Sequence, residues 1–288
     1  MPPWSCNLLS PAARILSILP LLAGFFFCLR LLPRHAAQRR RPASGAAGQL
    51  QLQARPWKPL DAALLLVVLS LPALPALLTA APPARNVPAA LPSVWQFVMT
   101  GVFYGVVLAG VWLAGRRTGL GAAAALGLSR TTARADLRTG VRLGLAMLPP
   151  VLLVAWLAEN LLQWLGLPAI RQNVFDTLAN PALGAAARLL LLLLAVVLAP
   201  IAEEAVFRGV LFPTLLRRCR LPIALLLANA LFALLHLHLP SFLPLLAVGI
   251  CLSLGMTATG SLLTPITMHA IFNAEMLLLF HAWPELAG

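Results

Sequence analysis

Long apolar runs recur along this chain of 288 residues and constrain its fold more than any other feature. Crossing the hydrocarbon core of a bilayer takes about 20 apolar residues in an α-helix. The runs lie at residues 12–32, 60–81, 94–115, 142–165, 184–207, 222–239, 241–257 and 262–282. They are continuous rather than alternating, which favours helices over a membrane β-barrel. We therefore expect an all-α, polytopic integral membrane protein with eight transmembrane helices, one for each run.

The basic residues lie mainly in the connections between these runs. They concentrate at residues 30–58, 116–142 and 217–220, and few lie at the opposite ends of the runs. The positive-inside rule assigns these three stretches to the cytoplasm. The same rule explains the net charge of +13 without a nucleic-acid partner. We expect the lipid bilayer, and no nucleic acid, to contact this chain.

Two adjacent carboxylates lie inside the fifth apolar run, at Glu203 and Glu204. A charged side chain at membrane depth costs roughly 2.5–3.5 kcal/mol on the insertion scale, so such residues usually have a function. Arg208 follows Glu204 at the i, i+4 spacing that places both on one helix face within pairing reach. Glu203 points about 100° away from Glu204. A packing salt bridge explains the pair and leaves Glu203 unexplained.

Two further polar pairs lie in later apolar runs. Phe232 is followed four residues later by His236, and His269 by Asn273. The i, i+4 spacing lets His269 and Asn273 point into one cavity. Asn229 lies seven residues before His236, on roughly the same helix face, where it orients the imidazole or packs. An intramembrane histidine or asparagine alone often only bonds to another helix.

The estimated depths of the two histidines and Glu203 in the bilayer agree with one another only in part. At about 1.5 Å per residue, Glu203 and His236 both lie roughly 21 Å from the cytoplasmic side. His269 lies only about 10 Å deep on the same rule. We therefore expect either that the last helix begins deeper in the bilayer or that the turn before it is re-entrant.

Taken together and in this order, the three patterns resemble the CPBP family. This family includes the type II CAAX prenyl endopeptidases and bacterial proteins of the Abi group, which process bacteriocins or confer self-immunity, and lysostaphin-resistance-like proteins. The family pattern is EExxxR, FxxxH and HxxxN, and the chain matches it without departure at Glu203, Glu204, Arg208, Phe232, His236, His269 and Asn273. The resemblance covers about residues 185–283.

The resemblance implies an all-helical membrane endopeptidase with a conical cavity. It implies that Glu203 is the general base that activates a water molecule, with help from His236. His269 and Asn273 would stabilise the oxyanion of the tetrahedral intermediate, since donors aimed at a developing oxyanion lower the barrier by a few kcal/mol. Glu204 and Arg208 of the first motif would support the positions of these residues. No nucleophilic serine or cysteine motif suggests covalent catalysis.

Other functions fit parts of the same pattern. Glu203, His236 and His269 could provide three zinc ligands with one open position. The chain lacks the HExxH pattern of compact zinc sites, so we expect a mechanism without a cofactor. A non-catalytic bacteriocin-immunity or partner-binding protein could contain the same motif residues and cleave no substrate. A proton-coupled transporter is a third possibility, but the chain has no internal repeat of the kind common in transporters.

We expect three regions in the chain. Residues 1–59 form an N-terminal span with a basic cytoplasmic linker, residues 60–183 add transmembrane helices, and residues 184–283 form the catalytic core. The Ala, Leu and Arg bias is typical of a GC-rich bacterial genome, which suggests the inner membrane of a bacterium. A hydrophobic peptide or membrane-associated protein is the expected substrate.

Overall fold

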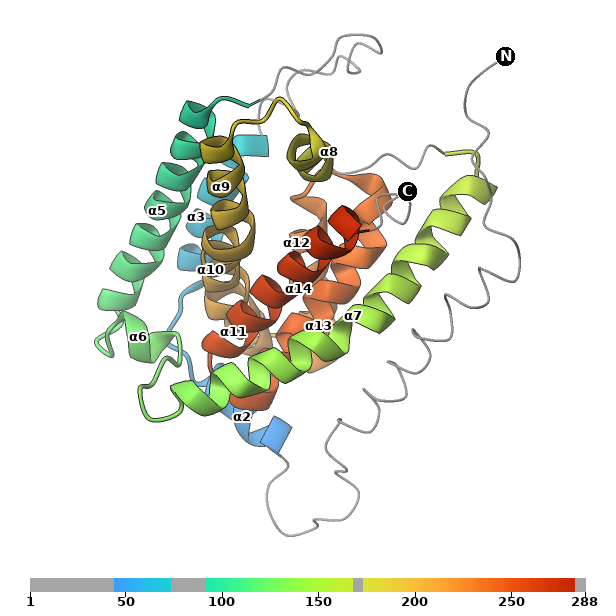
Figure 1. The fold of residues 1–288 in the computed structure, drawn as a ribbon. Helices are drawn as coiled ribbons and strands as arrows, with labels where there is room; N and C mark the ends of the chain where they lie inside the picture. Colours follow the sequence, from blue (N-terminus) through green and yellow to red (C-terminus); the bar gives the residue numbers. More distant parts are fainter. Residues whose placement is uncertain (1–43, 74–91, 168–172, 283–288) are drawn as a thin grey trace, which may run out of the picture.

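The structure, a computed structural model, describes residues 44–73, 92–167 and 173–282, and these ranges contain helices and no strands. The helices are α2 (Ser44–Gln53), α3 (Pro59–Ser70), η1 (Leu71–Ala73), α5 (Val94–Arg116), α6 (Ala122–Ala125), α7 (Ala133–Trp164), α8 (Asn173–Ala179), α9 (Ala185–Leu193), η2 (Leu194–Leu198), α10 (Ala199–Glu204), η3 (Ala205–Leu211), α11 (Phe212–Leu216), α12 (Leu221–Leu234), η4 (Leu239–Ser241), α13 (Phe242–Thr259) and α14 (Leu263–Ala282). Figure 1 shows how they pack.

Five helical segments in the described ranges are long and apolar enough to cross a membrane: Val94–Arg116, Ala133–Trp164, Ala185–Leu216, Leu239–Thr259 and Leu263–Phe280. The shorter apolar helices α3 and α12 lie beside them. The chain is therefore an all-α, polytopic integral membrane protein, as its apolar runs predict. The expected span at 12–32 lies outside the described residues, so the total of eight spans stays a prediction.

Three helices differ in length from the apolar runs that predict them. Helix α7 begins at Ala133 rather than at 142, because its first turns carry arginines that an apolar window excludes. The helical segment that holds the two glutamates continues to Leu216 instead of ending at 207. Helix α12 ends at Leu234 rather than at 239. The last of these differences changes the environment of His236.

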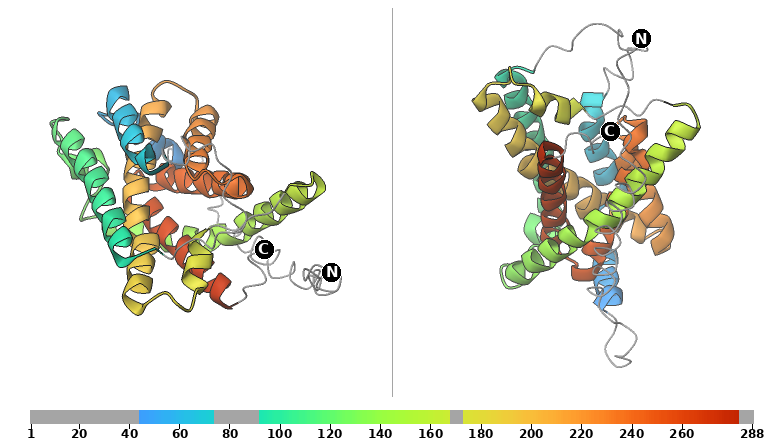
Figure 2. Two further views of the ribbon diagram at one scale, coloured as in Figure 1. Left: turned by 90° about the horizontal axis from the view of Figure 1, so that it is seen from above. Right: turned by 45° about the vertical axis from the view of Figure 1, so that its right-hand side comes forward.

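Helix α14 packs against α13 and against the helical segment that carries the two glutamates (Figure 2). Helices α3 and α5 pack against that segment, and α12 packs against α13 (Figure 1). Helix α7 crosses α14 and contacts α13. The close approach of α7 depends on Gly140 and Gly144, because a Cβ atom there would collide with Thr267 and press on Ile271 of α14. Small residues four apart commonly allow such contacts between membrane helices.

A segment around Arg55 joins the ends of several helices. Arg55 is buried and donates hydrogen bonds to the carbonyl groups of Ala124, Ala125 and Gly260. Arg217 in turn donates to the carbonyl of Arg55. The last carbonyls of a helix lack partners within the helix and carry a partial negative charge, so a guanidinium satisfies both needs. Burial lowers the pKa of Arg55 to about 10, which leaves it charged at neutral pH.

The turn between α13 and α14 lies beneath the surface. Gly260, which ends α13 with a φ of 67°, is buried together with Ser261 and Leu262. Helix α2 covers this turn, because a Cβ atom on Gly260 would strike the Gln51 side chain and one on Gly48 would strike the carbonyl of Thr257. Helix α14 therefore begins inside the protein. The expectation that the last helix begins deeper in the bilayer, or follows a re-entrant turn, stays a prediction.

Replacing Arg55 with Ala would leave carbonyl groups of two buried helix ends without a partner. We expect the variant to lose about 3 kcal/mol or more of unfolding free energy, since each unsatisfied buried group costs about 1–3 kcal/mol. Thermal unfolding in detergent measures the loss. Arg130, which is exposed in the loop before α7, provides the control, and equal stability of the Arg55→Ala and Arg130→Ala proteins would contradict the role of Arg55.

Candidate active site

The two glutamates lie on a short α-helical segment between two π-helical segments. Helix α10 separates η2 from η3, and each π segment ends two residues before a proline, Pro200 or Pro213. A proline ring collides with the carbonyl four residues earlier in an α-helix and cannot donate a hydrogen bond to it. A wider π turn relieves that collision, and such turns often occur at functional sites. The prolines thus explain why the helix deforms on both sides of the glutamates.

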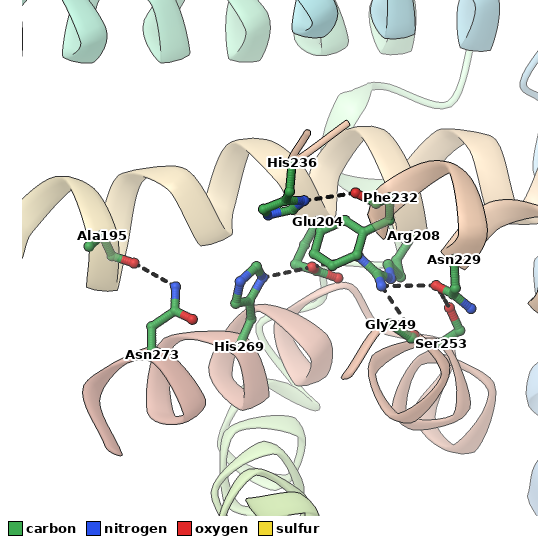
Figure 3. A network of polar contacts seen from close by, with 10 residues as sticks. All are labelled: Ala195, Glu204, Arg208, Asn229, Phe232, His236, Gly249, Ser253, His269 and Asn273. Atoms are coloured by element: carbon green, nitrogen blue, oxygen red, sulfur yellow. Dashed lines mark hydrogen bonds and ion pairs between the residues drawn. The ribbon is translucent and has the colours of Figure 1, made fainter. Parts of the chain in front are cut away.

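Glu204 is the centre of a buried ionic network (Figure 3). Its Oε1 atom accepts hydrogen bonds from Arg208 Nη1 at 2.8 Å and from His269 Nδ1 at 2.9 Å. The Glu204 and Arg208 side chains are both 0% exposed. The pairing expected from the i, i+4 spacing of these residues is therefore present. Its extension to His269 links η3 and α10 to α14.

Arg208 extends this network to two further helices. Its Nη2 atom donates to Asn229 Oδ1 at 3.0 Å and to the carbonyl of Gly249 at 3.1 Å. The Ser253 hydroxyl donates to the same Asn229 oxygen at 3.1 Å. Gly249 has to be glycine, because a Cβ atom there would lie 2.8 Å from Asn229 Oδ1. The buried guanidinium therefore has acceptors on its own helix, on α12 and on α13, which offset part of its desolvation cost.

Asn229 does not lie on the face of His236, contrary to expectation. The expectation assumed one continuous helix, but α12 ends at Leu234 and His236 lies in the turn that follows. Leu237, the next residue, has a φ of 50°, so the chain leaves the helical path there. Asn229 instead holds Arg208. His236 is exposed, and its Nδ1 bonds the carbonyl of Phe232 at 2.8 Å.

The ring of Phe232 joins the two histidines of the motifs. It is fully buried and lies edge-on to His236 at 4.8 Å and to His269 at 6.0 Å between ring centroids (Figure 3). The Arg208 guanidinium lies 4.6 Å from the same ring, within cation–π range. Phe232 therefore packs against the buried network on one side and supports His236 on the other.

Asn273 reaches the π-helical segment η2. Its Nδ2 atom donates a hydrogen bond to the carbonyl of Ala195 at 2.8 Å. A side-chain amide has two N–H groups, so one remains for another acceptor. His269 and Asn273 are one turn apart on α14, and both bind the deformed helix that carries the glutamates. Their shared face of α14 is the one that the spacing predicts.

Glu203 lies next to this network and is only half-buried. Helix α10, which carries Glu203, packs against α5. Within the described residues, Glu203 forms no ion pair, in contrast to Glu204.

The site does not have the geometry of a metal centre in the part of the chain that the structure describes. No three His, Cys, Asp or Glu side chains in that part are grouped closely enough to hold a metal ion. Glu203, His236 and His269, the alternative zinc ligands, therefore do not form a ligand set as they stand. His269 also points its Nδ1 atom at Glu204 rather than toward Glu203.

Comparison with known proteins agrees with the three motifs. Residues 185–274 match the family model described as type II CAAX prenyl endopeptidase Rce1-like. No curated protein and no solved structure matches the chain. The matched segment contains Glu203, Glu204, His236, His269 and Asn273, and it includes the buried network around Glu204. Residues 185–274 therefore form an Rce1-like segment, which supports membership of the CPBP family.

Proposed function

We propose that this protein is an intramembrane endopeptidase that hydrolyses a peptide bond with a water molecule activated by Glu203. The observation that carries the proposal is the contrast between the two adjacent glutamates. Glu204 is fully buried and bonded to Arg208 and His269, whereas Glu203 is half-buried and outside that network. A carboxylate that no cation neutralises is available to take a proton from water.

His236 is suited to assist this step. A backbone carbonyl can only accept, so the hydrogen bond to Phe232 requires the proton of the ring to be on Nδ1. In the neutral ring, Nε2 is then a free acceptor. His236 is exposed, so this atom is not enclosed by the protein. Nε2 can take up and return a proton during the reaction.

His269 and Asn273 are suited to bind the oxyanion. The Glu204 carboxylate accepts the Nδ1 proton of His269, so Nε2 donates only when the ring is doubly protonated. The charge of the doubly protonated ring is balanced by Glu204. Asn273 contributes its second N–H group, since the first is bonded to Ala195.

The reaction is then a direct hydrolysis. Glu203 removes a proton from water, and the oxygen of the resulting hydroxide attacks the carbonyl carbon of the substrate. The carbonyl oxygen becomes an oxyanion bound by His269 and Asn273. Collapse of the intermediate breaks the C–N bond, and the amine leaves with the proton that Glu203 or His236 returns. The products are one carboxylate and one amine, with no covalent enzyme intermediate.

The substrate in this proposal is a hydrophobic peptide or a membrane-associated protein in a bacterial inner membrane. The matched family is described by its prenyl endopeptidases, so a prenylated peptide is a second substrate class to assay. A zinc-dependent mechanism and a binding protein without turnover remain the competing hypotheses, and the experiments below separate them.

The first experiment assays cleavage of hydrophobic and prenylated peptides by the purified protein in detergent, with and without a strong chelator. We expect cleavage to persist with the chelator and to fall about 10³-fold in Glu203→Gln, since general base catalysis contributes about 10²–10⁴-fold. Glu159→Gln, a change near the C-terminal end of α7, is the matched control and should retain activity. Loss of cleavage with the chelator and recovery with zinc would overturn the metal-free mechanism. Equal cleavage by Glu203→Gln would overturn the role of Glu203.

The second experiment separates stability from activity in the buried network. Glu204→Leu alone leaves Arg208 buried without its carboxylate, and we expect a loss of about 3–5 kcal/mol of unfolding free energy. The double variant Glu204→Leu with Arg208→Met should recover much of that loss, because an apolar pair of similar volume can replace a buried ion pair. Its cleavage should stay low, since His269 still lacks its acceptor. A double variant that regained wild-type cleavage would refute the proposed role of Glu204.

A further inference from the structure

The first turns of α7 present a basic face that no other part of the described chain covers. Arg134, Arg138 and Arg142 follow one another at i, i+4 spacing, so they lie on one side of the helix. Leu137 and Val141 lie between them, and all five side chains are exposed. Together they line a hollow of about 400 Å³. We call these five residues the arginine face of α7.

The opposite side of the same turns holds α7 against α14. Gly140 lies at this contact, because a Cβ atom there would lie 2.6 Å from the Cβ atom of Thr267. Asp136 is buried, and its backbone carbonyl accepts a hydrogen bond from the Thr264 hydroxyl at 3.3 Å. These contacts fix the rotation of α7 about its own axis. The arginine face therefore points away from α14.

The three guanidinium groups of this face have no partner within the described part of the chain. None of them forms an ion pair or a side-chain hydrogen bond there. The acidic residue nearest to them on α7 is Asp136, which is buried and accepts a hydrogen bond from the Thr132 hydroxyl at 2.8 Å. A guanidinium presents its N–H donors in a fork that matches the oxygen atoms of a phosphate group. The arginine face thus offers donors to an anion and contains no anion of its own.

The charges along α7 place the arginine face at the edge of the bilayer core. Residues 143–158 carry no charge, and they lie between Arg142 and Glu159. At about 1.5 Å per residue this stretch is about 24 Å long, close to the roughly 30 Å thickness of the hydrocarbon core. Arg142 therefore lies near the boundary, from which an arginine side chain reaches the headgroups. Arg138 and Arg134 lie one and two turns farther out.

We propose that the arginine face of α7 binds an anionic phospholipid, with the phosphate group in the hollow between the guanidinium groups and the acyl chains along Leu137 and Val141. Charge complementarity supports the headgroup contact, since hydrogen bonds from arginine to phosphate are charge-assisted. The apolar side chains between the arginines favour a lipid over an acidic peptide or free phosphate, because a lipid covers both kinds of side chain at once. Leu145, exposed one turn farther into the uncharged stretch, continues the path of the acyl chains. Binding of this lipid does not depend on the proposed activity at Glu203.

Lipid binding to the full chain in a neutral detergent tests the proposal, with phosphatidylglycerol as the probe and native mass spectrometry as the readout. We expect the loss of all three arginines to weaken the tightest binding about 100-fold, since each basic residue at an anionic surface contributes about five-fold. The matched control removes three exposed arginines from other parts of the chain and should bind within about three-fold of the wild-type protein. The two triple variants are Arg134→Gln, Arg138→Gln, Arg142→Gln and, as control, Arg117→Gln, Arg130→Gln, Arg218→Gln.

All six positions are exposed, so both variants should unfold at the wild-type temperature when no lipid is added. Unchanged binding in the arginine-face variant, or an equal loss in the two variants, would overturn the site.

The kind of ligand is tested on the wild-type protein. Phosphatidylcholine, which is zwitterionic, should bind at least 10-fold more weakly than phosphatidylglycerol. Neither inorganic phosphate nor oligoglutamate should displace the lipid at equal concentration. Equal binding of phosphatidylcholine would overturn the role of charge, and displacement by inorganic phosphate or oligoglutamate would overturn the lipid as the occupant.

Discussion

The arrangement of the site depends on the buried carboxylate of Glu204. One oxygen atom of this group binds Arg208 and His269, and Arg208 binds α12 and α13 in turn. A buried charge without partners is too costly to persist, so each of these helices has to stay where its polar group meets the network. The ionic contacts therefore fix the relative positions of helices that apolar packing alone would hold less specifically. Breaking these contacts would be costly, which favours one fixed arrangement of the helices.

The sequence predicts the features that depend on local spacing. Apolar run length gives the all-α membrane fold, and the i, i+4 spacing gives both the Glu204–Arg208 pair and the shared face of His269 and Asn273. The angle between adjacent helical residues also separates Glu203 from Glu204. These inferences succeed because each depends only on helix geometry near the residues concerned. The roles of these residues in catalysis stay predictions.

The features that the sequence does not predict depend on contacts between distant segments or on where a helix ends. Asn229 binds Arg208 because α12 packs on η3, and no spacing within α12 indicates this partner. His236 departs from the expected face because its helix stops earlier than the apolar run. The burial of the turn before α14 depends on α2, which covers it. The π segments are an intermediate case, since Pro200 and Pro213 indicate a disturbed helix but not its geometry.

Adjacent glutamates allow one short helix to provide a fixed anion and a reactive base. Their side chains point about 100° apart, so Glu204 faces the buried network and Glu203 does not. A cation beside Glu203 would hold its carboxylate as an ion pair and weaken it as a base. In the part of the chain that the structure describes, Glu203 forms no ion pair, whereas Glu204 pairs with Arg208 and His269. Ion pairing thus distinguishes the two carboxylates: Glu204 is held by charged partners, and Glu203, which has none, is the one proposed to react.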